Sequence, residues 1–180
     1  MTTIPARLPS VLRRLRWMVD ALARLALLLV LAWCLGGAPA PAAAEFSGVD
    51  YTLTNQNEQD FSGQDLANTS FAGAAGRHAD FSGANLHGAI LTQAAFPEAS
   101  FAGADLSGVL MDKVDFSGAD FTGADLSDVI ASGSNFSGAT VTNADFTGAL
   151  IDRVDQRLLC RDAEGTHPLT GADTRLSLGC

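Results

Sequence analysis

The chain has 180 residues, a formal net charge of −9, 47% hydrophobic residues and only 17% charged residues. This balance excludes an intrinsically disordered chain, which would be rich in charge and poor in apolar side chains. It also argues against nucleic acid as a partner, because a chain with 20 acidic and 11 basic residues lacks the basic surface that binds phosphates.

The first 44 residues have the pattern of a secretory signal peptide. Arginines between positions 7 and 24 precede an uninterrupted apolar run at residues 25–35, and a stretch of small residues ends at Ala42-Ala43-Ala44. The competing interpretation is a membrane anchor, but an anchor needs about 20 apolar residues. We therefore expect export, cleavage after Ala44, and a mature protein that starts at Glu45 and is not inserted in a membrane. A translation start at Met18 and either export route, Sec or twin-arginine, stay open.

After this segment the sequence repeats with a period of five residues. Written in fives from Phe46 to Asp155, it forms 22 blocks without an insertion, and all ten phenylalanines stand at the first position of a block, which we call the centre. Nineteen of the 22 centres are large and apolar, and the exceptions are Gln56, Gly76 and Ala131. Two residues before the centre, 20 of the 22 positions hold Ala, Val, Ser or Thr. The pattern fits neither a helix nor an alternating strand, and it indicates a solenoid with one large and one small inward side chain per block.

The blocks resemble those of the pentapeptide-repeat family, whose motif is A-(D/N)-L-x-x around a central Leu or Phe. Full motifs stand at residues 104–108 and 119–123, and the matches extend from Val49 to Val154. The resemblance implies an all-β solenoid, a right-handed quadrilateral β-helix with four blocks in each coil. The sequence supports four sides because like centres recur every 20 residues, as in the ladders Phe46, Leu66, Leu86, Leu106, Leu126, Phe146 and Phe61, Phe81, Phe101, Phe121, Val141.

The 22 blocks give about 5.5 coils, so we divide the chain into a signal peptide (1–44), a β-helix (45–155) and a C-terminal cap (156–180). At the cap, residues 157–160 are expected to lay an apolar turn over the last coil. At the opposite end, polar residues hold inward positions in the first blocks, so we expect that end to be frayed or modified: Thr54, Gln56, Gln59 and Gln64.

Two cysteines remain in the mature chain, Cys160 and Cys180. An even pair in an oxidising compartment favours a disulfide over metal ligands, and this bond would tie the cap to itself. The ending GTHPLTGADTRLSLGC, residues 165–180, resembles the tails of lumenal pentapeptide-repeat proteins of cyanobacteria and chloroplasts. This second resemblance implies a location in the thylakoid lumen or periplasm, and it implies no chemistry.

The residue before each centre is expected to point outward, and on one side of the coil this position forms an acidic ladder. Because like charges about 5 Å apart repel, the ladder is expected to have raised pKa values or to bind divalent cations weakly. The alternative is that Asp and Asn recur there because their side chains bond nearby backbone groups. The ladder consists of Asp65, Asp105, Asp125 and Asp145, with Asn85 between the first two.

The next side departs from the motif, because aliphatic residues replace Asp and Asn at four successive outward positions: Ile90, Leu110, Ile130 and Leu150. Such an apolar stripe marks an interaction surface more often than an accident. We expect it to receive an unidentified protein partner or a second copy of the chain, with a polar rim of Asp112, Lys113, Asp152 and Arg153. The alternative is that the chain covers it with its own N-terminal segment or with the tail residues Leu169, Leu176 and Leu178.

Nothing in the sequence indicates an enzyme. It has no phosphate-binding, zinc-protease or nucleophile-elbow motif, and its three histidines are scattered and expected at the surface. We therefore expect no catalytic residue, no cofactor and no metal, and a non-enzymatic structural or protein-interaction module. Two alternatives stay open: an acidic rod that mimics B-DNA and binds a type II topoisomerase, and a rod that binds divalent cations weakly. Export argues against the topoisomerase, which acts in the cytoplasm.

Overall fold

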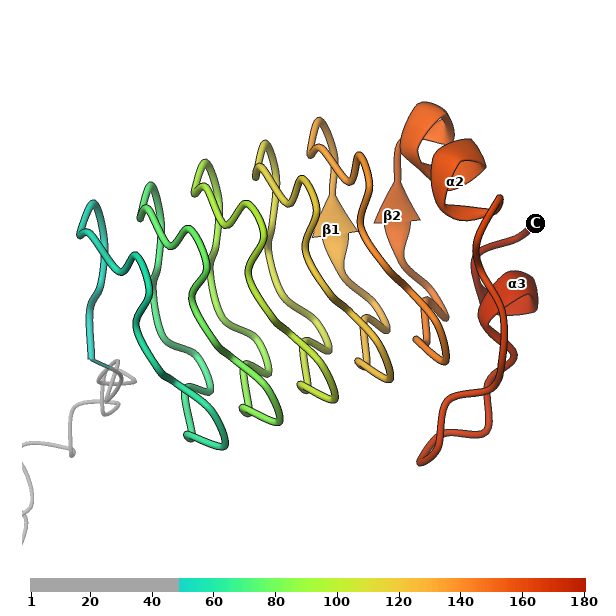
Figure 1. Ribbon diagram of the computed structural model, residues 1–180, viewed down its shortest axis with the longest axis horizontal. Coiled ribbons are helices and arrows are strands. Elements are labelled where there is room, and N and C mark those ends of the chain that lie inside the picture. Colours follow the sequence, from blue (N-terminus) through green and yellow to red (C-terminus); the bar gives the residue numbers. More distant parts are fainter. Residues whose placement is uncertain (1–48) are drawn as a thin grey trace, which may run out of the picture. The chain divides into compact units, whose positions relative to one another are not determined.

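The computed structural model describes residues 49–180, so the predicted signal peptide and its cleavage site lie outside the described residues. Residues 20 apart pair as parallel β-bridges, and the bridges recur at every fifth residue, as in Asp80 with Ser100 and Asn85 with Asp105. Each coil of the solenoid therefore has 20 residues and four sides. Figure 1 shows the coils of residues 49–180 stacked side by side along one axis. On one side the pairing widens into two short strands, β1 (Ile130–Ala131) and β2 (Leu150–Ile151), which pair in parallel with Ile130 opposite Leu150.

Backbone hydrogen bonds join each coil to the next and close each corner. The N–H of Phe81 donates to the carbonyl of Ser100 in the following coil at 2.7 Å, and the N–H of Ala84 donates back to the carbonyl of Phe81 at 3.0 Å. The corner turn places its third residue at positive φ, as in Gly83 at 65°. Glycine adopts this conformation without strain, which explains why Gly recurs two residues after the centre.

The core is one side chain wide and is made of stacked centres. Phe81 and Phe101 stack with ring centroids 5.0 Å apart and planes 1° apart, and Phe101 stacks on Phe121 at 5.1 Å. Rings from different sides of the coil meet edge to face, as Phe81 and Phe96 do at 88°. These rings are fully buried, so the 20-residue period of the sequence is also the period of the core.

Two of the three exceptional centres, Gly76 and Ala131, still fit the core. At Gly76 a neighbouring ring fills the space, and at Ala131 the small side chain is itself buried. At Gly76, a Cβ atom would lie 2.4 Å from both Cδ1 and Cε1 of Phe96, so the ring of the following coil occupies the place of the missing side chain. Ala131 is 1% exposed. The third exception, Gln56, lies in the first described coil and donates from Nε2 to the Thr54 hydroxyl at 2.9 Å.

The expectation of a frayed N-terminal end is wrong for residues 50–69. This coil forms regular bridges, with Asp50 paired to Ser70 and Asn55 to Ala75. Two of the residues expected to point inward, Gln59 and Gln64, are exposed. At the end of the described solenoid their amides reach solvent, so polar side chains at these positions need no partner in the core.

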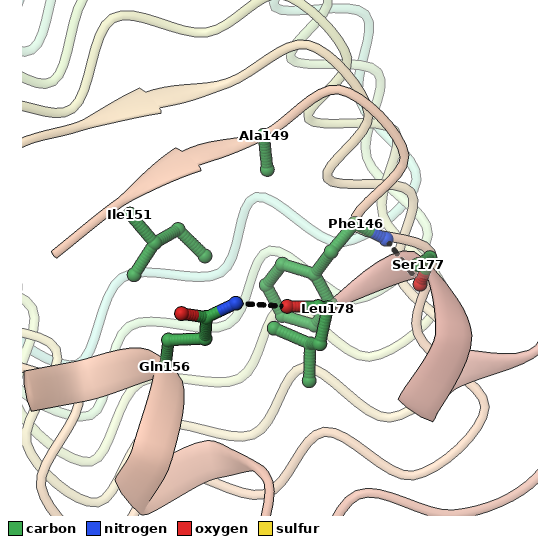
Figure 2. A pocket seen from close by; sticks show the side chains of 6 residues that line it. All are labelled: Phe146, Ala149, Ile151, Gln156, Ser177 and Leu178. Carbon is green, nitrogen blue, oxygen red and sulfur yellow. Dashed lines mark hydrogen bonds between the residues drawn. The ribbon is translucent and has the colours of Figure 1, made fainter. Parts of the chain in front are cut away.

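The C-terminal end of the solenoid is closed by two short helices, α2 (Arg153–Leu159) and α3 (Thr174–Ser177) (Figure 1). Helix α2 begins before residue 156, where we expected the cap to start, and it replaces the expected turn at residues 157–160. Leu178, which directly follows α3, is 4% exposed and closes the end of the core beside Phe146 (Figure 2). Within residues 49–180, no helix has the length and apolar character needed to cross a bilayer.

A hydrogen bond fastens the cap to the last coil, and further contacts join the two helical segments of the cap to each other. The N–H of Phe146 donates to the Ser177 hydroxyl at 3.0 Å, and Gln156 donates from its side-chain amide to the carbonyl of Leu178 (Figure 2). A disulfide joins Cys160 to Cys180, whose Cα atoms are 5.7 Å apart. Within the cap, Arg175 also donates a hydrogen bond to the carbonyl of Cys160 at 2.7 Å. That Cys160 and Cys180 are also joined by a disulfide in the cell stays a prediction, which labelling of free thiols can test.

Candidate interaction surface

The four aliphatic residues of the apolar stripe lie on successive coils of one side of the solenoid. Parallel bridges join Ile90 to Leu110 and Leu110 to Ile130, and the β1–β2 pair adds Leu150. Leu110 is 39% exposed and Leu150 is 60% exposed, whereas the two isoleucines are partly buried. The stripe is therefore a continuous column of aliphatic side chains that solvent reaches.

The tail of the chain does not cover this stripe. Of the three tail leucines that we considered as a cover, Leu178 is buried at the end of the solenoid, while Leu169 and Leu176 are 91% and 80% exposed. The other expected cover, the N-terminal segment, lies outside the described residues. Among residues 49–180, the stripe thus keeps two exposed leucines, Leu110 and Leu150.

Two acidic residues of the predicted rim hold the backbone of the adjacent turn. Asp112 accepts a hydrogen bond from the N–H of Ser132 at 3.1 Å, and Asp152 accepts one from the N–H of Gly133 at 2.8 Å. Both bonds join neighbouring coils, so these carboxylates are fixed beside the stripe. Lys113 and Arg153, the basic members of the rim, are exposed.

Parallel bridges join the residues of the acidic ladder in the order Asp65, Asn85, Asp105, Asp125 and Asp145. Asp145 is 3% exposed, so the expectation of an outward, solvated side chain is wrong at this member. The carboxylates of the ladder bond the local backbone: the N–H two residues further on donates to Asp105 at 2.9 Å, to Asp125 at 2.9 Å and to Asp145 at 2.8 Å. This geometry supports the interpretation that Asp recurs here for the turn. Among residues 49–180, no group of three or more His, Cys, Asp or Glu side chains is placed to hold a metal ion.

One member of the ladder, Asp145, has an environment that sequence reasoning missed. Burial acts to raise the pKa of this carboxyl, but hydrogen bonds from Thr147 and Thr170 lower it below its usual value. For Asp145 the expectation of a raised pKa is therefore wrong. The physical reason is that hydrogen-bond donors from the tail and the turn outweigh the effect of burial.

His167 is 3% exposed, so the expectation of a surface histidine is wrong at this position. Its Nδ1 accepts a hydrogen bond from the N–H of Thr170 at 3.1 Å, and its Nε2 lies 3.1 Å from the carbonyl oxygen of Gly123. Since a backbone N–H can only donate and a carbonyl can only accept, the ring is the neutral tautomer with its proton on Nε2. The ring thereby links the tail to a coil 44 residues away.

The repeats match the family model described as pentapeptide repeats, in 8 copies that cover residues 60–93, 89–128, 99–138 and 115–153. Among solved structures, a pentapeptide repeat protein from the thylakoid lumen of Arabidopsis thaliana is similar, with a TM-score of 0.71 and 31% identity over 81% of this chain and 97% of that chain. The pentapeptide repeat protein Rfr23 of the cyanobacterium Cyanothece has a TM-score of 0.52 and 19% identity over 55% of this chain and 88% of its own.

Among curated proteins, the chloroplastic thylakoid lumenal protein TL20.3 of Arabidopsis thaliana is 57% identical over 35 residues. This match covers 19% of the chain and spans 12% of the length of that relative. The solved structures place the chain among right-handed β-helix solenoids, as the repeat motif implied.

Proposed function

Because the chain belongs to the pentapeptide-repeat family, we propose that it is a non-enzymatic solenoid that acts as a protein-interaction module in the thylakoid lumen or the periplasm. The observation that carries this proposal is the apolar stripe, whose leucines stay exposed although the same outward position holds Asp or Asn on the preceding side of the coil.

The proposed location draws on three features. The first 44 residues have the pattern of an export signal, two similar proteins are lumenal, and the two remaining cysteines are paired across the cap. A paired cysteine is typical of oxidising compartments outside the cytoplasm. The proposal also includes the details of the fold. The solenoid has about 5.5 coils, and a disulfide between Cys160 and Cys180 holds the cap closed.

The energy available from the stripe sets the kind of contact that it supports. Full burial of an exposed aliphatic side chain contributes about 1.5–3 kcal/mol, so about 6–12 kcal/mol is the upper limit for four. The four side chains of the stripe are already partly buried, so binding gains less than this limit. Association costs about 4–15 kcal/mol in lost freedom of motion. The apolar contact alone therefore gives weak binding, and a specific complex needs polar contacts around the stripe as well.

The experiment compares Leu110→Asp/Ile130→Asp with a matched control, Ser100→Asp/Thr140→Asp. The control adds the same charge at outward positions of the opposite side, where Asp80 and Asp120 already stand in the same ladder. Each protein is used as bait against the exported fraction of its host. We expect the stripe variant to keep its melting temperature and to lose partners that the wild type and the control retain.

Two outcomes would contradict the proposal. Retention of every partner by the stripe variant would remove the stripe as the interaction surface. A full-length chain found only in the cytoplasm would remove the proposed location, and it would make the topoisomerase-binding alternative the one to test.

A further inference from the structure

The spacing of the apolar stripe selects the secondary structure of what binds it. The four residues of the stripe stand on successive coils, and we call each of them a rung. Neighbouring rungs lie about 4.8 Å apart, so Ile90 and Leu150, three coils apart, are separated by about 14 Å. Four side chains on one face of a helix, one per turn of 5.4 Å, span about 16 Å. Four side chains on one face of a strand span about 20 Å. Side chains of a helix that lies along the solenoid axis therefore match the spacing of all four rungs. Side chains of a strand are spaced too widely to contact all four.

The charge beside the stripe selects the chemistry of that helix. Apart from the buried Asp145, seven acidic residues stand in the adjacent ladders and turns, and only two basic ones, Lys113 and Arg153, accompany them: Asp105, Asp112, Asp115, Asp125, Asp128, Asp152 and Asp155. In residues 49–180 the ion pairs all involve Glu98, which contacts Arg77 at 3.0 Å and His78 at 3.6 Å. In the part of the chain that the structure describes, none of the seven carboxylates beside the stripe forms an ion pair.

A second copy of the chain fits this surface poorly. Residues 49–180 hold 6 basic and 18 acidic side chains, a charge of 6 − 18 = −12, so two stripes pressed together would bring like charges into contact. Like-charge juxtaposition costs several kcal/mol at an interface, whereas complementary charge adds specificity and speeds association. The partner that complements both the stripe and its surroundings is aliphatic in the middle and basic at the edges.

A hollow lies beside the turn that leads into the last residue of the stripe, and an exposed leucine of the cap lines it. A shallow hollow of about 370 Å³ opens beside Gly148, two residues before Leu150. Leu176 of α3 lines this hollow and is 80% exposed. The hollow gives a bound helix one more aliphatic contact at the C-terminal end of the solenoid.

We propose that the apolar stripe binds a basic amphipathic α-helix of a partner protein, one that presents an aliphatic side chain on each of four turns and Lys or Arg on both flanks. This rests on the proposed function, because it names the class of partner for the same surface. The helix lies along the solenoid axis, its aliphatic side chains meet the four rungs, and its cations meet the carboxylates of the adjacent ladders.

The probe is a fluorescein-labelled helical peptide with Leu at positions i, i+4, i+7 and i+11 and Lys at the flanking positions. Its binding to the purified protein is followed by fluorescence anisotropy. A second peptide carries Glu in place of each Lys and is otherwise identical. We expect the Lys peptide to bind and the Glu peptide to bind at least about tenfold more weakly. Salt at about 1 M, where the Debye length is about 3 Å, should weaken the Lys peptide's binding strongly.

The variants assign the binding to the stripe. We expect Leu110→Asp/Ile130→Asp to weaken the Lys peptide's binding by at least about tenfold, and Ser100→Asp/Thr140→Asp to leave it unchanged, since both pairs add the same charge. Leu150→Asp, at the most exposed rung, serves as the second stripe variant should the double variant melt at a lower temperature than the control.

The inference is overturned by equal binding of the two peptides, by unchanged binding in the stripe variants, or by self-association of the wild type that the stripe variants lose. The last would identify a second copy as the occupant. Failure of the Lys peptide to bind, together with loss of native partners by the stripe variant, would refute the partner chemistry and leave the proposed function standing. Retention of native partners by the stripe variant would refute the proposed function itself.

Discussion

The centre at Gly76 allows a test of how the core is packed. The repeat pattern alone favours a large apolar residue at this position, so Gly76→Ala should stabilise the protein if the pattern were the whole explanation. In the structure, however, the new Cβ atom would lie 2.4 Å from two carbons of the Phe96 ring, closer than side-chain carbons approach. The backbone of Gly76 is not in the left-handed region, so its conformation does not oppose the substitution.

The expected magnitude follows from two opposing effects. Replacing Gly by Ala removes freedom from the unfolded chain and stabilises by about 0.4–1 kcal/mol. Forcing an extra carbon into a filled core costs about 1–3 kcal/mol. The Phe96 ring is fully buried between Phe71 and Phe116 and has little room to move, so the packing cost should exceed the gain. We expect Gly76→Ala to lower the free energy of unfolding by about 0.5–2 kcal/mol.

Urea unfolding of four proteins measures this effect: the wild type, Gly76→Ala, Phe96→Leu and the double variant. Because Phe96→Leu removes the ring that occupies the site, Gly76→Ala should be neutral or stabilising in that background. The coupling free energy between the two substitutions should then reach about 1 kcal/mol or more. A stabilising effect of Gly76→Ala in the wild-type background, additive with that of Phe96→Leu, would refute the packing argument.

Three further predictions concern the cap and the export signal. Mass spectrometry without reductant should find no alkylatable thiol at Cys160 or Cys180, and reduction should lower stability by about 3 kcal/mol for this loop of 20 residues; two free thiols would contradict the bond. The lowered pKa of Asp145 stabilises the folded state above the unfolded value of 3.8, and this contribution is lost as the pH falls through the lower folded pKa. The deficit of Asp145→Asn relative to the wild type should therefore shrink in acid, and a deficit that grows would reverse the assigned sign. Amino-terminal sequencing of the exported protein should begin at Glu45, and a start at Met1 or Met18 would exclude the predicted cleavage.

The stacking of the core could be predicted from the sequence because it depends on periods alone. Once the coil is assigned 20 residues, Phe81 must lie over Phe61 and under Phe101, and the structure stacks these rings. The aliphatic stripe follows from the same arithmetic at Ile90 and Leu110, which are bridged partners. The period predicts these contacts because each side chain packs against the residue 20 positions further along the chain, in the next coil.

Features that break the period could not be predicted in the same way. The sequence shows Gly76 as a gap, but the direction of the Phe96 ring that fills it depends on rotamers. The burial of His167 depends on the carbonyl of Gly123, a backbone group that any residue provides and that leaves no signature in the sequence. In the tail, Leu176 and Leu178 are equally apolar, and the short helix α3 determines which of them faces the core.

The register of the bridges also limits which changes in chain length this surface tolerates during evolution. Deletion of 20 residues, for example 91–110, would remove one coil and bring Ile90 opposite Ile130, so the column of aliphatic side chains would be shortened and otherwise preserved. Deletion of five residues, for example 100–104, would leave every remaining block intact yet turn all later blocks by one side, and Ile90 would then face Asp115. Insertions and deletions in this lineage should therefore be accepted in steps of a whole coil, even though the unit that repeats in the sequence is only a quarter of that length.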